Sequence, residues 1–202
     1  MTFKLIALNG PPRSGKDTVA HALMRNGADF GKSHRFMHRK FADALKDTVH
    51  YFLGYGYKEE DKENVSLYGG STHRQLYIGL SELWAKPLLG DGIFGRIFTE
   101  RALQWSNSSS KQCIFIASDS GFASEFDVVS REIGRDNCIV AEVHREGYTF
   151  DGDSRSYWCE NPDLRLMNTS DLAVFEQRSV ASIKQLMVAK GWIREEPTGT
   201  KV

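Results

Sequence analysis

Residues Leu8–Leu23 read LNGPPRSGKDTVAHAL and contain the pattern GxxxxGK at Gly10, Gly15 and Lys16. The preceding run KLIALNG is apolar and ends in glycine, which is typical of a buried parallel strand, and the following GKDTVAHALMRNG predicts a helix. Glycines let the backbone curl so that its N–H groups and the helix amino terminus surround phosphate oxygens, and the lysine adds a full charge. The stretch therefore predicts a strand, a phosphate-binding loop and a helix. The residues predicted to contact a nucleotide are Gly10, Arg13, Ser14, Gly15, Lys16, Asp17 and Thr18.

An aspartate follows the loop lysine at the position where the pattern has serine or threonine, and Thr18 comes one residue later. Successive helical residues are rotated by about 100° around the axis, so Asp17 rather than Thr18 takes the position that faces a metal. A carboxylate beside phosphates is tolerable chiefly when Mg²⁺ stands between them. The sequence therefore predicts that Asp17 binds Mg²⁺ directly or through water.

A second metal ligand is predicted at Asp119, which ends the apolar run QCIFIASDS. An acid at this place in a phosphate-binding fold can hold Mg²⁺ directly or through water. The competing interpretation is structural, because Asp119 or Ser118 would also serve as the N-cap of the next helix.

The composition limits the classes of protein to which the chain can belong. It has 202 residues, 41% of them hydrophobic, which is enough for one substantial core and predicts a single domain. The 26 basic and 26 acidic residues cancel, so no positive field favours a nucleic acid or a membrane as partner. Cys113, Cys138 and Cys159 are odd in number and widely spaced, which predicts reduced thiols. We expect a soluble cytoplasmic protein.

The order of patterns along the chain predicts an α/β fold with a parallel sheet covered on both faces. Helical patterns occupy ADALKDTVHYFLGYG and the segment from Thr72 to about Gln104, which is interrupted at KPLLGDG. Strands are predicted at QCIFIASDS, NCIVAEVHR and DLAVFE, and the last helix at RSVASIKQLMVAKGW. The charged connector YKEEDKENVSLYGGS predicts a loop, and residues 146–167, rich in polar and turn residues, predict a mobile flap.

Several arginines and aromatic residues have two interpretations each. Phosphoryl transfer needs planar cations around the phosphates, so Arg74, Arg96, Arg145 and Arg155 are candidates, although most arginines are simply solvated. The six histidines show no metal-ligand spacing. Four aromatic side chains could stack on a base, although their helical spacing also fits core packing. They are Phe41, Tyr51, Tyr77 and Trp84.

These residues together resemble a known family, the bacteriophage deoxynucleoside monophosphate kinases, within the P-loop nucleoside monophosphate kinases. The loop LNGPPRSGKDTVA is similar to that family's loop, including Lys-Asp-Thr, and FADALKDTV to its FAxPLK segment. HRQLYIGLSELW and DGIFGRIFTERAL resemble its RQLxQALGTE and WVxxF helices. FIASDSGFASEFDVV resembles the family's strand that ends in Asp-x-Arg, together with the helix after it. IVAEVHREG resembles the strand before its Arg-Pro-Gly turn. SDLAVFEQRSVASIKQL resembles its closing DLVIxNDGSLEEL pattern.

The resemblance implies a P-loop three-layer sandwich with a helical acceptor-binding segment at about 42–107 and a lid at about 146–167. It implies transfer of the γ-phosphoryl group of ATP to a (deoxy)nucleoside 5′-monophosphate, with Mg²⁺ as cofactor and the host cytoplasm as location. A homodimer is one assembly to consider. Lys16, Arg145 and Arg155 would be catalytic. The acceptor-binding residues would be Phe41, Asp43, Lys46, Arg74, Gln75, Trp84 and Arg96.

The chain also departs from the family pattern. Gly121 stands where the family has an arginine two residues after the strand-end aspartate, so another residue must supply that charge if it is needed. Arg145 lacks the proline that follows it in the family, and in the flap only Glu160 matches. Two other functions stay open: a P-loop kinase acting on a phosphorylated metabolite such as dephospho-coenzyme A or phosphomevalonate, and a nucleotide-binding protein without turnover.

Overall fold

The chain forms a five-stranded sheet in which all strands are parallel and the order is β2-β3-β1-β4-β5. The computed structural model describes residues 2–53, 69–169 and 171–194, so most of the charged connector predicted at 57–71 lies outside the described residues. The strands are β1 (Lys4–Asn9), β2 (His34–His38), β3 (Gln112–Ala117), β4 (Cys138–His144) and β5 (Leu164–Met167). β1, β3 and β4 are almost fully buried, as their continuous apolar runs predict.

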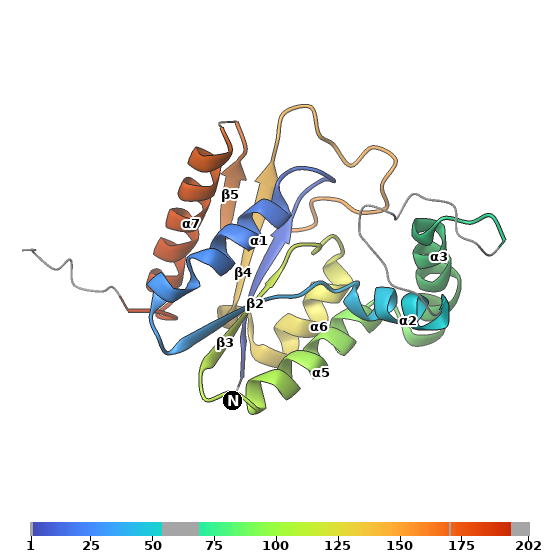
Figure 1. Ribbon diagram of the computed structural model, residues 1–202, viewed down its shortest axis with the longest axis horizontal. Helices are drawn as coiled ribbons and strands as arrows, with labels where there is room; N and C mark the ends of the chain where they lie inside the picture. The colour runs from blue at the N-terminus through green and yellow to red at the C-terminus, as the bar shows by residue number, and fades with distance from the viewer. Residues whose placement is uncertain (1, 54–68, 170, 195–202) are drawn as a thin grey trace, which may run out of the picture.

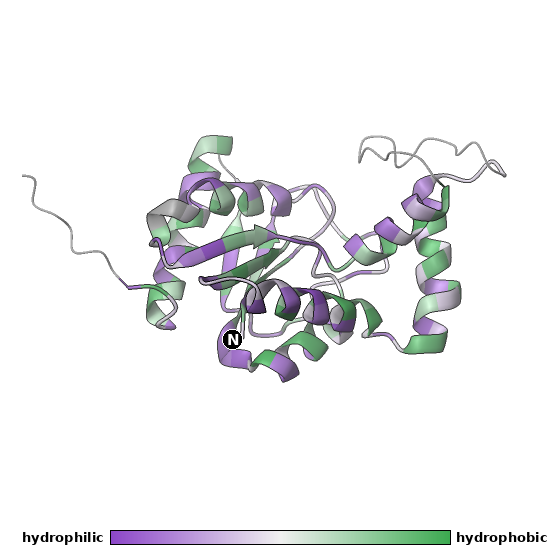
Figure 2. Cartoon of the chain, turned by 60° about the horizontal axis from the view of Figure 1, so that its bottom comes forward, coloured by the Kyte–Doolittle hydropathy of each residue, from purple (hydrophilic) through white to green (hydrophobic). Residues whose placement is uncertain are grey.

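Helices cover both faces of the sheet, so the fold is the three-layer α/β sandwich that the alternation of patterns predicts (Figure 1). α1 (Lys16–Arg25) and α7 (Leu172–Ala189) lie on one face, while α5 (Ile93–Asn107) and α6 (Ala123–Ile133) lie on the other. The helices carry hydrophobic and hydrophilic residues along their length (Figure 2). None of the helices within the described ranges has the length and apolar character needed to cross a membrane.

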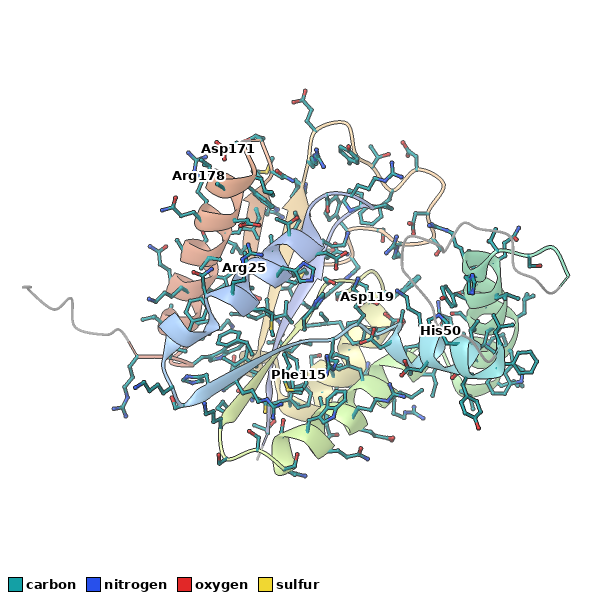
Figure 3. The ribbon with its side chains drawn as sticks, viewed as in Figure 1. Arg25, His50, Phe115, Asp119, Asp171 and Arg178 are labelled. Atoms are coloured by element: carbon teal, nitrogen blue, oxygen red, sulfur yellow. The ribbon has the colours of Figure 1, made fainter. Side chains whose placement is uncertain are left out.

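Aromatic side chains form the centre of the layer between the sheet and α5. Phe115 of β3 (Figure 3) makes edge contacts with Phe3 and Phe98 at centroid distances of 5.2 and 5.9 Å and stacks on Trp105 at 5.9 Å. Phe41 joins the same cluster at 4.8 Å from Phe98. Such pairs add about 0.5–1.5 kcal/mol each beyond the burial of their area, so they fix α5 against the sheet.

A second group of helices projects from one side of the sandwich (Figure 1). It contains α2 (Asp43–Leu53), α3 (His73–Gly79), the π-helical turn η3 (Leu80–Ala85) and α4 (Lys86–Leu89). The break predicted at KPLLGDG is confirmed, because α4 ends at Leu89 and α5 begins at Ile93. His50 of α2 (Figure 3) and Tyr77 of α3 are 2.6 Å apart in a hydrogen bond that joins the two helices.

The structure differs from the predicted elements at three places. The edge strand β2 was missed, because polar histidines at both of its ends hide the buried Phe36 and Met37. The segment DLAVFE is not a strand but the first turns of α7, where the Asp171 carboxylate accepts the Val174 N–H at 2.9 Å as an N-cap. The last strand is Leu164–Met167, which lies within the flap predicted at 146–167.

α5 and α6 approach each other closely where Gly95 of α5 and Gly92, the N-cap residue of α5, face α6. A Cβ at Gly95 would lie 2.8 Å from the Glu125 carbonyl carbon and 2.9 Å from its Cα, and would lie closer still to the carbonyl oxygen. A Cβ at Gly92 would lie 2.7 Å from a methyl group of Val128. The two helix backbones therefore need residues without side chains at this contact.

Candidate functional site

The loop between β1 and α1 lies at the carboxyl end of the sheet. β1 is the central strand, with β3 on one side and β4 on the other, and the chain leaves it through α1 toward the edge strand β2. Ligands of open α/β sheets bind outside the carboxyl ends of the strands, at the point where the strand connections diverge. The loop occupies that point.

The glycines of the loop are required by its close contacts. A Cβ at Gly10 would collide with the Val143 carbonyl group of β4 and lie 2.8 Å from the Ser14 hydroxyl. Gly15 has a φ of 110°, and a Cβ there would lie 2.8 Å from the Asn168 amide. Arg13 also adopts a left-handed conformation, with a φ of 62°. The loop is therefore tightly curled, as its sequence pattern predicts.

Lys16 folds back over this loop. Its Nζ donates to the carbonyl oxygens of Gly10 at 2.7 Å and Pro11 at 2.6 Å, and the residue is 8% exposed. Burial and, next, the positive charge of Arg155 lower the pKa of Lys16 to about 8, against the attraction of Asp17. The positive charge is therefore costly in this place, and a bound anion would restore its stability.

A cavity of about 320 Å³ extends from the loop toward the ends of β4 and β5. Arg145, which follows β4, donates from Nη1 to the Arg13 carbonyl at 3.0 Å and lies over the Tyr148 ring at 4.5 Å. Asn168, which follows β5, donates to the Ser14 carbonyl at 2.9 Å. The lining residues are Arg13, Gly15, Lys16, Asp17, Thr18, Arg145, Asn168 and Leu172. The sequence missed Asn168 and Leu172, because it assigned the last strand to the wrong segment.

Asp17 belongs to a polar network that joins α1 to the ends of β2 and β3. Its Oδ1 accepts the Ser118 hydroxyl at 2.6 Å and forms an ion pair with Lys40 Nζ at 2.9 Å, while His38 Nε2 lies 2.8 Å from the same hydroxyl. Because the serine proton goes to Asp17, His38 must donate its Nε2 proton to Ser118. Burial raises the pKa of Asp17, but the hydrogen bonds from Ser118 and Lys40 outweigh it and hold the pKa below its usual value.

Asp119 has a different environment, between the sheet and α2 (Figure 3). Its two carboxylate oxygens accept the backbone N–H groups of Phe41 at 2.9 Å and Ala42 at 3.0 Å. Desolvation raises the pKa of Asp119, although the two amide hydrogen bonds lower it. The carboxylate therefore holds the start of α2 to the end of β3. The sequence left open a structural role for Asp119 as the N-cap of the helix that follows it in the chain. The structure gives Asp119 a structural role at α2 instead.

The two acids differ in how well they fit Mg²⁺. The Asp17 side chain is 57% exposed and lines the cavity, so its oxygens are accessible to a cation together with phosphate oxygens, which is how Mg²⁺ is usually held. Both Asp119 oxygens already accept backbone amides. Within the described part of the chain, no group of three His, Cys, Asp or Glu side chains forms a complete cage. The Asp17 site fits the ion. The metal role of Asp119 stays a prediction, because its two oxygens already hold backbone N–H groups of the segment before α2.

A second cavity, of about 500 Å³, adjoins the first at Asp17. Of the acceptor residues suggested by the sequence, Asp43 and Lys46 line it. Asp17 was predicted from the loop motif, but the sequence gave no motif for the other four, which come from α1, the end of β2 and the turn after it. The lining residues are Asp17, His21, His38, Arg39, Lys40, Asp43 and Lys46.

The remaining predicted acceptor residues lie apart from both cavities. Phe41 is 2% exposed within the core and lines neither cavity, so its role in acceptor binding stays a prediction. Gln75 forms a capping box with Thr72 at the start of α3. Trp84 is 54% exposed on η3, and Arg96 is exposed on α5. Neither residue lines either cavity.

Arg74 of α3 lies within electrostatic range of the flap. The charge of Arg74 lowers the pKa of Asp153, after the hydrogen bonds that Asp153 accepts from Arg155, which places Arg74 close to the flap. The flap arches over the carboxyl end of the sheet (Figure 1). Its second half is fixed there, because Trp158 Nε1 donates to the Ser120 carbonyl at 2.9 Å. Glu160, the acid that matched the family in sequence, is exposed and supplies a backbone acceptor to Arg165 at 3.4 Å.

Comparison with protein-family models and with curated proteins finds no match. The chain is similar to solved structures of low identity. The Mycobacterium tuberculosis APS kinase CysC in complex with AMPPNP and APS is 15% identical over 92% of this chain and 98% of that one, with a TM-score of 0.46. A gluconokinase from Sinorhizobium meliloti 1021 is 13% identical over 95% and 98%, with a TM-score of 0.44. APE1195 is 19% identical over 93% and 96%, with a TM-score of 0.46.

Proposed function

We propose that this chain transfers the γ-phosphoryl group of ATP to the phosphate of a (deoxy)nucleoside 5′-monophosphate. The observation that carries the proposal is the pair of cavities that meet at Asp17, one formed on the phosphate-binding loop and the other lined by cationic side chains. Two adjoining sites for anions, with a carboxylate at their junction, suit transfer between two bound phosphates, because this chemistry depends on positioning and on neutralising charge.

The donor would lie in the cavity of the loop. The loop amides and the amino terminus of α1 would hold its phosphates, and Lys16 would leave the Gly10 and Pro11 carbonyls to bind phosphate oxygens. The base would extend toward Asn168 and Leu172. Arg145 and Arg155 would add positive charge around the transferred group. Mg²⁺, when bound, would be held by Asp17 and would neutralise the charge of the donor phosphates.

The acceptor would lie in the second cavity. Arg39, Lys40 and Lys46 supply positive charge there for its 5′-phosphate, and the rings of His21 and His38 supply flat surfaces. These residues replace Phe41 and Trp84 in the acceptor site that the sequence suggests. A nucleotide matches a cavity of about 500 Å³ in size and charge.

A product assay tests this function. The protein would be incubated with ATP, Mg²⁺ and each of the eight common nucleoside monophosphates, with dephospho-coenzyme A and phosphomevalonate as alternative acceptors. We expect a nucleoside diphosphate and ADP in equal amounts. A product from one of the other two acceptors alone would replace the proposed function, and nucleotide binding without ADP release would favour a non-catalytic protein.

The lowered pKa of Lys16 predicts proton uptake when a nucleotide binds. In the free protein Lys16 loses its proton as the pH rises through about 8, and the phosphates of ADP favour the charged form and so raise this pKa. We expect calorimetry at pH 8.5, in two buffers of different ionisation enthalpy, to show uptake of a large fraction of one proton per ADP. Lys16→Met should abolish this uptake, while equal uptake by the variant would assign the proton to another group.

The negative charge of Asp17 predicts how ATP binding and turnover depend on Mg²⁺. Asp17→Ser removes a charge that repels bare phosphates, so ATP should bind more tightly than to the wild type in EDTA, by roughly tenfold. The same variant should need more Mg²⁺ for half-maximal turnover. Calorimetry with and without Mg²⁺, together with a metal titration of the rate, measures both effects. Thr18→Val should change both quantities less, and the opposite ranking would make Thr18 the metal ligand.

A further inference from the structure

Gly121 lies just beyond β3 and has no room for a side chain. A Cβ at this position would lie 2.5 Å from Arg155 Cγ and 3.0 Å from Arg155 Cβ, and it would collide with Cδ. Gly121 is not among the glycines with a positive φ, so its backbone conformation does not itself require glycine. The requirement comes from Arg155, whose aliphatic stem lies directly on the glycine.

Asp153 fixes the other end of the same arginine. The carboxylate accepts Arg155 Nε at 2.8 Å and Nη2 at 2.5 Å, in the bidentate geometry that orients a guanidinium most firmly. The Arg155 backbone N–H also donates to Asp153 at 3.0 Å. The two side chains are only 24% and 10% exposed, so solvent competes little with this pair.

Asn9, the last residue of β1 before the loop, holds the backbone beside both partners: it donates to the carbonyls of Ser120 at 2.7 Å and Ser156 at 3.0 Å, the neighbours of Gly121 and Arg155. The Asp153 carboxylate raises the pKa of Arg155 most, with smaller contributions from Asp119 and Glu125, and the charge of Arg155 lowers the pKa of Lys16 after burial does. Two cations therefore share one region at the end of the central strands. An anion bound between them would relieve their mutual repulsion.

We propose that Gly121 and Asp153 are positioning residues that seat Arg155 across the end of β3, where its guanidinium stabilises the phosphoryl group in transfer beside Lys16. This inference rests on the proposed function. It specifies how the site obtains a second positive charge in addition to that of Lys16. The arginine belongs to the flap rather than to the sheet, so its charge reaches the site only while the flap is docked. Gly121 leaves open the space that the flap arginine fills.

Turnover in a set of variants tests the seating. Arg155→Ala should lower kcat by at least tenfold while the Kd for ATP changes by less than about threefold, because the charge acts mainly in the transition state. Gly121→Ala should reproduce this loss, because its methyl group displaces the arginine stem. The double variant should be no slower than Arg155→Ala alone. Gly79→Ala is the matched control, since a Cβ there meets no atom within 4 Å, and it should keep wild-type kcat.

A binding measurement tests the same geometry without turnover. Because the charge of Arg155 lowers the pKa of Lys16, Arg155→Ala and Gly121→Ala should both move proton uptake on ADP binding to higher pH, and Gly79→Ala should not. If Gly121→Ala does not fold, Asp153→Asn tests the same seating. This variant should have a lower kcat than the wild type, and adding it to Arg155→Ala should not lower kcat further. Wild-type kcat and uptake in Gly121→Ala, or losses that multiply in the double variants, would overturn the inference. Absence of turnover in the wild type would reject the proposed function, while the uptake experiment would still test the seating.

Discussion

Lys16→Ala is expected to lower kcat by roughly two or more decades and to weaken ATP binding much less. In the free protein the Lys16 ammonium already donates to the Gly10 and Pro11 carbonyls, so binding to ATP exchanges these hydrogen bonds for new ones and gains little. As the γ-phosphoryl group departs, negative charge develops on the bridging oxygen. The lysine would stabilise this charge without losing any further hydrogen bond. The effect should therefore appear mainly in kcat.

Steady-state kinetics and calorimetry with a non-hydrolysable ATP analogue measure the two quantities separately. Lys111→Ala provides the matched control, because it removes the same charge from an exposed position at the opposite end of β3 and should leave both values unchanged. Wild-type turnover in Lys16→Ala would mean that the loop is not a donor site. A loss confined to ATP affinity would mean that Lys16 binds the ground state alone.

Gly95→Ala should destabilise the fold by about 2 kcal/mol, although alanine is the better helix former. The added methyl group meets the backbone of Glu125 in α6, and a backbone cannot move aside as the end of a flexible side chain can. α5 and α6 would have to separate, which also loosens Phe94 and Phe98 of α5 in the core. For a domain of this size we expect the Tm to fall by roughly 4–8 °C.

Chemical denaturation of three variants measures this packing effect. Gly79→Ala makes the same substitution in a helix where a Cβ meets nothing within 4 Å, so it should stabilise the fold by about 0.5–1 kcal/mol. Gly92→Ala, which faces a movable methyl group of Val128 as well as the Ser124 carbonyl, should lie between the other two. If Gly95→Ala were as stable as Gly79→Ala, the close contact between α5 and α6 would be wrong.

Much of the fold could be predicted because its signals are local. A buried parallel strand must be apolar along its whole length, and β1, β3 and β4 are apolar runs that the sequence displays directly. The edge strand β2 and the short β5 lack this signal, since each has polar residues and only part of each is buried. DLAVFE is apolar enough for a strand, but the N-cap at Asp171 and packing against the sheet make it helical.

The α/β fold class and the curled loop between β1 and α1 can be predicted from the sequence alone, because the glycines, the lysine and the flanking strand and helix all lie within one short stretch of chain. The partners of the charged groups depend on long-range packing and cannot be predicted from the sequence. The tertiary structure pairs Asp17 with Lys40, gives both oxygens of Asp119 to backbone amides, and lays Arg155 on Gly121. These contacts join residues that are far apart in sequence, and no local pattern records which of several arginines or acids the packing of the sheet, α2 and the flap will bring together.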